Sequence, residues 1–239
     1  MRSYISITYA LRLYRSLTKR WLNKIELDIM IHIMAEKSKE IFENIFSKYA
    51  KTDDIFNDVV NFHIENDKIK TMEHSIKVAE KGIELAMDFN ESVYKIKLAL
   101  YLHDISVVIP NNLKIEYSEV NGIEILREER IFPIIIHQKL SKNIAQKIFQ
   151  VYDMDVLNAI ECHTTLKANP SKLDMILFIS DKIKWDQDGF PPYIDVIEKN
   201  LKISLNNGVK EFINYLMDNK HQLKVLHPLL IEAYEYFNR

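Results

Sequence analysis

Residues 96–104 read IKLALYLHD and combine the pattern of a core helix with two polar side chains at its end. Ile96, Ala99 and Leu100 recur at the spacing of one helical face, and His103 continues that face. Asp104 follows directly. Burying a polar group without a partner costs about 1–3 kcal/mol, so such a pair needs partners in the core. The stretch therefore predicts a helix that delivers a His-Asp pair into the protein interior.

The same spacing brings other polar side chains inward. Val156, Ala159 and Ile160 lead to His163. The apolar face of residues 173–180 leads to Asp181, His137 begins a face of its own, and His74 lies on a more mixed face. A lone inward histidine is usually a hydrogen-bonded core residue. Several of them beside a His-Asp pair favour a metal site, because neutral imidazoles and carboxylates are suitable ligands for a cation. His32, His63 and His221 show no comparable context, and we expect them to be surface or packing residues.

Composition predicts an all-α chain. The 239 residues include 4 glycines and 6 prolines, and every proline lies at position 110 or later. Strand-rich folds need many turn-forming residues, so this scarcity argues against a sandwich, a barrel or a fold with glycine-rich nucleotide loops. Helices are expected at 36–49, 54–65, 68–88, 92–104, 113–128, 134–150, 154–163, 172–185, 193–205, 209–219 and 228–237.

Charge and cysteine content restrict the function classes. The net charge of −2 hides six basic residues and no acid in residues 1–25, so the remainder carries −8. An acidic body is a poor general binder of nucleic acid. The single cysteine, Cys162, excludes an internal disulfide and suits a reducing compartment, so we expect a cytoplasmic protein. The apolar stretches are too short to form a transmembrane segment.

The order His74, His103-Asp104, Asp181 resembles the H…HD…D signature of the HD-domain superfamily of metal-dependent phosphohydrolases. The chain is more similar still to the YqeK-type branch, whose members cleave diadenosine tetraphosphate symmetrically. The similarity covers roughly residues 65–237. It includes Glu73-His74-Ser75, Leu102-His103-Asp104, His137, Cys162-His163-Thr164-Thr165 and Ile179-Ser180-Asp181-Lys182-Ile183.

The resemblance implies a single HD-domain helical bundle and a dinuclear metal site. His74, His103, Asp104 and Asp181 would bind one ion, and His137 and His163 a second, with Asp104 bridging and the His103-Asp104 pair as the catalytic centre. It also implies two divalent transition metals per chain. Iron is typical of the branch, with manganese, cobalt, zinc or magnesium as alternatives. A metal-activated hydroxide would then attack a nucleotide or related small phosphoester or phosphoanhydride.

The residues that face the substrate depart from the branch. Val107 stands where a lysine is common, and Gln187 where an arginine is common. Lys139, Lys167 and Lys182 are the replacement cations that we expect to hold phosphate, and Trp185 could stack on a base. The missing cations also support an alternative, in which the chain is a metal-organised nucleotide-binding or regulatory module with little turnover.

We expect residues 1–35 to form a basic amphipathic N-terminal extension and residues 36–239 the HD-type domain. Leu11, Tyr14, Leu17, Trp21 and Ile25 recur at helical spacing between basic side chains. Such a helix docks on the body of the protein, on a partner groove or on a membrane surface, and can also be a targeting peptide; docking on the body is favoured. A homodimer is left open.

Overall fold

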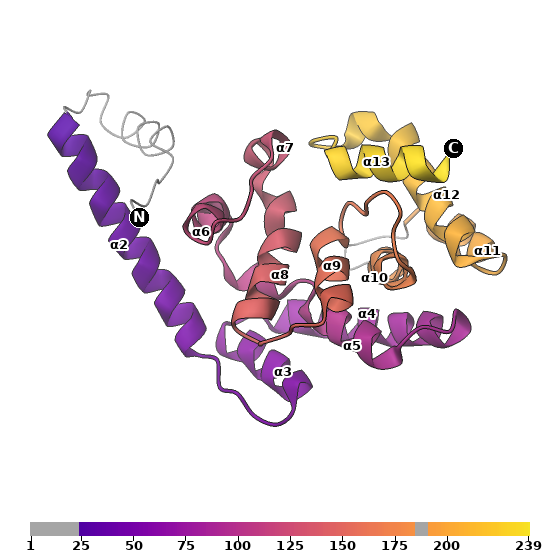
Figure 1. The fold of residues 1–239 in the computed structure, drawn as a ribbon, viewed down its shortest axis with the longest axis horizontal. Helices are drawn as coiled ribbons and strands as arrows, with labels where there is room; N and C mark the ends of the chain where they lie inside the picture. The colour runs from indigo at the N-terminus through magenta and orange to yellow at the C-terminus, as the bar shows by residue number, and fades with distance from the viewer. Residues whose placement is uncertain (1–23, 185–190) are drawn as a thin grey trace.

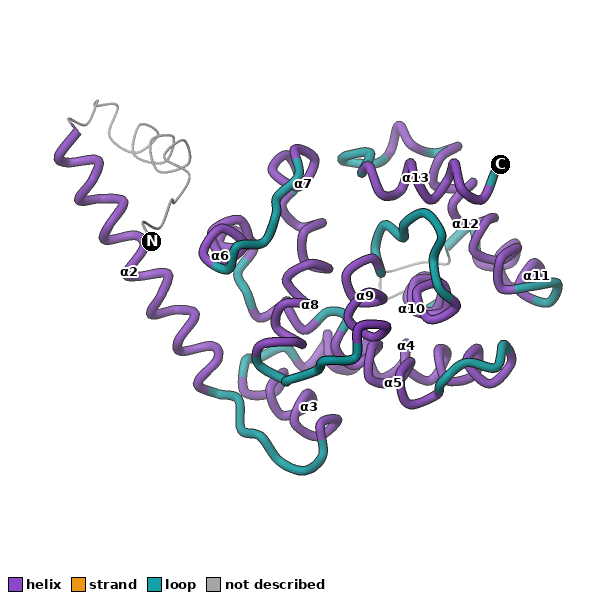
Figure 2. Tube along the Cα trace, viewed as in Figure 1, coloured by secondary structure: helices purple, strands orange, loops and turns teal. Residues whose placement is uncertain are grey.

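The computed structural model describes residues 24–184 and 191–239, with side chains from residue 36 onward. These residues form α-helices and short 3-10 segments without any strand (Figure 2), so the predicted all-α class is confirmed. The first half holds α2 (Lys24–Ser47), α3 (Ile55–Glu65), α4 (Ile69–Asp88), α5 (Val93–Leu102), α6 (Lys114–Val120) and α7 (Arg127–Ile131). The second half holds α8 (His137–Lys147), α9 (Met154–Cys162), α10 (Lys172–Ile183), α11 (Ile194–Leu201), α12 (Leu205–Asp218) and α13 (Pro228–Phe237).

Short polar side chains determine where several helices begin. The Asp54 carboxylate accepts hydrogen bonds from two backbone N–H groups at the start of α3, and Asp153 does the same for α9. Ser171 and Asp174 form a capping box at the start of α10. Each cap satisfies N–H groups that have no partner within the helix, which contributes about 1 kcal/mol. Pro228 occupies the first turn of α13, where its missing N–H costs no hydrogen bond.

Helix α10 lies at the centre of the bundle. Its residues 173–180 are all buried, and it packs against α4, α5, α9 and α12 (Figure 1). This central position explains why most of these residues are apolar. Helix α5 is buried on most sides as well, packing against α4 and α9. Helices α11, α12 and α13 cover the end of the molecule that holds the C-terminus.

Several predicted helix boundaries are wrong. The helix expected at 113–128 ends at Val120, because Gly122 adopts a positive φ of 67° there, and α7 starts afresh at Arg127. The helix expected at 193–205 ends at Leu201, and the one expected at 209–219 begins at Leu205 after its cap Ser204, so Gly208 lies buried inside α12. A Cβ on Gly208 would come within 2.5 Å of the Leu201 side chain, so this glycine permits close packing of α11 on α12.

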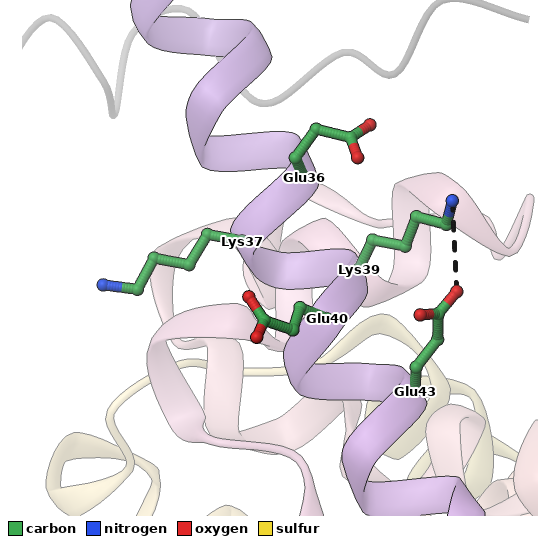
Figure 3. Close-up of a pocket in the computed structure, with 5 residues that line it drawn as sticks. All are labelled: Glu36, Lys37, Lys39, Glu40 and Glu43. Atoms are coloured by element: carbon green, nitrogen blue, oxygen red, sulfur yellow. Dashed lines mark ion pairs between the residues drawn. The ribbon is translucent and has the colours of Figure 1, made fainter.

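Helix α2 begins upstream of the predicted boundary at residue 36 and extends away from the bundle (Figure 1). Its C-terminal half packs on the body, where the Phe42 ring meets Tyr117 with centroids 5.2 Å apart. Its outer face carries charged side chains around a surface hollow, including an ion pair between Lys39 and Glu43 at 3.9 Å (Figure 3). The amphipathic pattern predicted for residues 11–25 lies almost entirely outside the described residues. Within the described part of the chain, no helix has the length and apolar character that crossing a membrane requires.

Candidate metal centre

The six predicted metal ligands come from five helices that meet in the bundle. His74 lies in α4 and Asp181 in α10. His103 is the residue that ends α5, and Asp104 follows it; His163 ends α9 in the same way. His137 is the first residue of α8. Three of these side chains stand at helix ends, where the chain can turn so that neighbouring residues reach one point.

Backbone carbonyls orient three of the imidazoles. The Nδ1 atom of His103 lies 2.6 Å from the Leu100 carbonyl, that of His137 2.9 Å from Ile134, and that of His163 2.8 Å from Ile160. A carbonyl oxygen only accepts, so each Nδ1 carries the proton and donates it. In the neutral form of each ring, the Nε2 atom then presents a lone pair, which is the arrangement of a histidine prepared to bind a metal.

The lone-pair atoms converge. His137 Nε2 and His163 Nε2 lie 2.9 Å apart, and Asp104 Oδ1 lies 3.3 Å from the first and 3.5 Å from the second. The other oxygen of Asp104 lies 3.5 Å from His103 Nε2. Asp181 Oδ1 lies 3.1 Å from His74 Nε2 and 3.7 Å from His103 Nε2. Asp104 thus stands between two groups of imidazoles.

This arrangement fits divalent cations. The ligand atoms of His74, His103 and Asp104 all lie within 4.8 Å of one another, and so do those of Asp104, His137 and His163. His103 Nε2 is buried and has no hydrogen-bond partner among the described residues. Two imidazole lone pairs facing each other at 2.9 Å repel unless a cation or proton lies between them. The donor set of nitrogen and carboxylate oxygen suits transition metals.

The electrostatics of the site keep its carboxylates charged. Burial opposes ionisation of Asp104, but His103, His137 and His163 outweigh it and hold its pKa well below the ordinary value. For Asp181, Lys182 and the imidazoles of His103 and His74 do the same. Burial lowers the pKa of His163 to about 4, so its imidazole is neutral. Burial also disfavours charge on His103, but Asp104 and Asp181 prevail and raise its pKa to about 9, so a cation would displace a proton there.

The three lysines expected to bind substrate have different surroundings. Lys139 Nζ lies 2.9 Å from the buried carboxylate of Glu129, and Lys167 Nζ lies 2.8 Å from the buried Asp174. Both ammonium groups are therefore already paired. Lys182 Nζ donates to Asp181 Oδ2 at 2.6 Å and so lies at the metal-ligand cluster itself. Trp185 and Gln187 fall outside the described residues.

Two residues near the cluster were not singled out by the sequence. His63 is completely buried, its Nε2 has no partner among the described side chains, and burial lowers its pKa, with smaller influences from the charges of Asp104 and His103. Lys114 is 3% exposed. Burial lowers its pKa, and the charge of Asp104 partly opposes this effect. The burial of His63 could have been predicted, because Val59, Phe62 and His63 follow helical spacing on one buried face of α3. No local pattern distinguishes Lys114 from an exposed lysine.

Comparisons with known proteins identify the family that the chain resembles. The model of the HD domain family matches residues 71–186, a range that includes all six predicted ligands. An uncharacterized protein encoded in the pepC 5′ region of Lactococcus lactis subsp. cremoris is 46% identical over 132 residues, which is 55% of this chain and 67% of the relative.

More distant relatives have named activities. A symmetrical bis(5′-nucleosyl)-tetraphosphatase of Staphylococcus aureus is 30% identical over 48% of this chain and 59% of its own length. The protein of that name from Bacillus subtilis is 25% identical over 60% of this chain and 76% of its own length.

A solved structure has the same fold. The predicted HD superfamily hydrolase of Clostridium acetobutylicum, described as involved in NAD metabolism, matches 77% of this chain and 96% of its own with a TM-score of 0.68 and 28% identity. The family match, the relatives and the shared fold confirm the similarity that the sequence motifs predicted. The chain is a hydrolase that belongs to the HD-domain superfamily and is related to the symmetrical dinucleoside tetraphosphatases.

Proposed function

We propose that this chain is a two-metal phosphohydrolase that acts on a nucleotide or a related phosphoanhydride, with dinucleoside polyphosphates as the first substrates to test. The observation that carries the proposal is the position of Asp104, whose two oxygens face His137 and His163 on one side and His103 on the other. His74, His103, Asp104 and Asp181 would hold one ion, and Asp104, His137 and His163 the other. The names of the distant relatives support the substrate class.

Bound divalent cations supply charge neutralisation at the phosphoryl oxygens and make a water molecule more acidic. The chain's own residues prepare the site for them. The Nδ1 protons donated to Leu100, Ile134 and Ile160 hold three imidazoles in one tautomer and orientation. Thr164 Oγ1 lies 3.1 Å from His137 Nε2, and this contact would give way when the Nε2 lone pair binds a cation. Lys182 keeps Asp181 ionised and contributes positive charge for phosphate.

The proposed metal is iron, with other divalent transition metals as alternatives, and the purified protein should carry about two ions per chain. Metal content is measured by plasma mass spectrometry. Replacing both His103 and Asp104 with alanine should remove both ions and all hydrolysis, whereas His221→Ala, which changes an exposed histidine, should leave both unchanged. Full activity in metal-free protein would refute the proposal.

The substrate is identified by a panel that compares diadenosine tetraphosphate with ATP and ADP, with products separated by anion-exchange chromatography. Symmetrical cleavage of the dinucleotide releases only ADP, whereas attack at an outer phosphate releases AMP and ATP. A matched panel on the His103→Ala, Asp104→Ala protein gives the background rate.

A second candidate is a nucleotide-binding or regulatory module with little turnover. It is favoured by the pairing of Lys139 with Glu129 and of Lys167 with Asp174, which leaves fewer cations for phosphate. Thermal stabilisation by a nucleotide without release of product would support this module, because a ligand that binds only the native state raises its stability by RT ln(1 + [L]/Kd).

We also propose the division into an extension of residues 1–35 and a hydrolase domain of residues 36–239. The division is tested by deleting residues 1–35 and comparing metal content and activity with those of the full chain. We expect both to be retained, since the six proposed ligands lie between residues 74 and 181.

A further inference from the structure

Lys114, at the start of α6, is a buried cation with little compensation. Its side chain is 3% exposed, and its Nζ atom donates one long hydrogen bond, 3.4 Å, to the Ser106 carbonyl. The ion pairs found among the residues that the structure describes include none with Lys114, whose ammonium contacts the Ser106 carbonyl instead. An ammonium group has three donors, so most of its hydrogen-bonding capacity is unused.

The position of Lys114 ties it to the metal centre. Ser106, whose carbonyl it contacts, lies two residues after Asp104. The Ser106 hydroxyl donates to the His137 carbonyl at 2.9 Å, and the Ser106 N–H donates to Ser141 Oγ at 3.2 Å. The Lys114 ammonium therefore contacts Ser106, the residue whose hydrogen bonds link the segment after Asp104 to His137. It is not itself hydrogen-bonded to any of the proposed metal ligands in the described structure.

The charges around Lys114 favour an additional anion. Burial is the main influence that lowers the pKa of Lys114, to about 8; Asp104 opposes this effect and the neighbouring Lys68 adds to it. The positive charges of Lys114 and Lys68 repel each other. The carboxylate that opposes this repulsion is Asp104, which we propose as a metal ligand. A negatively charged group close to Lys114 would relieve both the repulsion and the lack of hydrogen bonds.

We propose that Lys114 binds a phosphoryl oxygen of the substrate, with Lys68 adding positive charge to the same subsite. This inference rests on the proposed phosphohydrolase function and assigns the phosphate-binding role to a residue outside the three lysines expected from sequence. The cost of burying an unpaired ammonium in the phosphate-free protein is then explained, because the site is completed only when substrate is bound.

The test uses the full-length, metal-loaded protein and two probes, inorganic phosphate and pyrophosphate, with affinities measured by isothermal titration calorimetry. Lys114→Met removes the charge and keeps the length of the side chain, and Lys114→Gln repeats the test with a polar group. Lys172→Met is the matched control, since the Lys172 ammonium also donates to a backbone carbonyl, that of Phe89 at 3.1 Å, but is exposed.

Both Lys114 variants should bind the probes about 10- to 100-fold more weakly, which is the contribution of a hydrogen bond to a charged group. Their metal content should equal that of the wild type, and the melting temperature of Lys114→Met without phosphate should be unchanged or higher, because an uncompensated buried charge has been removed. A structural role for Lys114 would instead lower the melting temperature.

Unchanged phosphate affinity in both Lys114 variants, or equal weakening in Lys172→Met, would overturn the inference. Loss of metal from the Lys114 variants would also overturn it, since the lysine would then act on the ligand cluster. The proposed function is judged separately by hydrolysis in the wild type. Retained hydrolysis with unchanged affinity in the variants rejects only the role of Lys114, whereas absence of hydrolysis and metal from the wild type rejects the proposed function itself.

Discussion

At the scale of single residues, Asp104 and the histidines around it have separable roles. Asp104 contacts both groups of imidazoles, while the Nε2 atom of His163 lies 2.9 Å from His137 Nε2 and 3.5 Å from Asp104 Oδ1, the oxygen that faces the proposed second ion. We expect Asp104→Ala to lose both ions and His163→Ala to lose one, keeping about one ion per chain. Plasma mass spectrometry measures the stoichiometry, and Asp155→Ala, which changes an exposed aspartate, is the control. Retention of two ions in His163→Ala would contradict a second metal subsite.

The sequence predicted the candidate ligands because each stands in or beside a helical pattern. His103 and His163 continue apolar faces, so the pattern itself indicates that they point inward. Lys114 escaped prediction because its burial results from the packing of α6 and from Ser106, not from its neighbours in the chain. Local periodicity reports the face of a helix, whereas the environment of that face depends on which other helices cover it.

At the scale of elements, the buried Glu129 joins three helices. Its carboxylate accepts from the Leu126 N–H at 2.7 Å, is paired with Lys139 of α8 at 2.9 Å, and lies 3.3 Å from His227 Nε2 at the start of α13. We expect Lys139→Met to destabilise the protein by about 3–5 kcal/mol, because a buried carboxylate would lose its counter-ion. Chemical denaturation measures this loss. Lys81→Met, which breaks an ion pair with the exposed Glu84, should cost at most about 1 kcal/mol.

The same cluster predicts a dependence on pH. Burial opposes ionisation of Glu129, but His227, the Leu126 N–H and Lys139 outweigh it and lower its pKa. The ionised Glu129 carboxylate therefore stabilises the fold fully at pH values above the pKa of a glutamate in the unfolded chain. This stabilisation is lost as the pH falls through the lower pKa that Glu129 has in the folded protein. The destabilisation caused by Lys139→Met should shrink on acidification. A Lys139→Met protein as stable as the wild type at neutral pH would instead favour the substrate-binding role predicted for Lys139.

Gly82 determines how closely α4 approaches α5. A Cβ at this position would collide with the Leu100 side chain and lie 3.1 Å from Ile96 Cγ2. Gly82→Ala should therefore cost about 1–3 kcal/mol, despite the better helix propensity of alanine. It should also weaken metal binding, since α4 carries His74 and α5 ends at His103. Denaturation and metal titration measure the two effects, with the exposed Lys77→Ala on α4 as control. Unchanged stability and metal affinity would show that the contact relaxes at no cost.

At the scale of the whole molecule, composition predicted the fold class but not the arrangement of its helices. A chain with 4 glycines and an apolar period of 3.6 residues has few ways to form sheets, so the all-α class followed. The contact of α4 with α10, which brings His74 to Asp181, joins positions 107 residues apart. Such pairings depend on the complementary shapes of many helices at once, and no local pattern encodes them.

Because five helices contribute ligands to one cluster, we expect metal binding to stabilise the whole protein against unfolding. Without cations, two carboxylates and four imidazoles must share one buried site, with two Nε2 atoms 2.9 Å apart. Binding to the native state alone at a concentration 100 times Kd stabilises it by about 2.7 kcal/mol. For a chain of this size, that corresponds to a rise in melting temperature of roughly 5–10 °C. Calorimetry should therefore show a lower melting temperature after treatment with a chelator and recovery when metal is restored, while the His103→Ala, Asp104→Ala protein should not respond to either. A chelator that leaves the wild-type transition unmoved would show that the helices hold the cluster together without help from a cation.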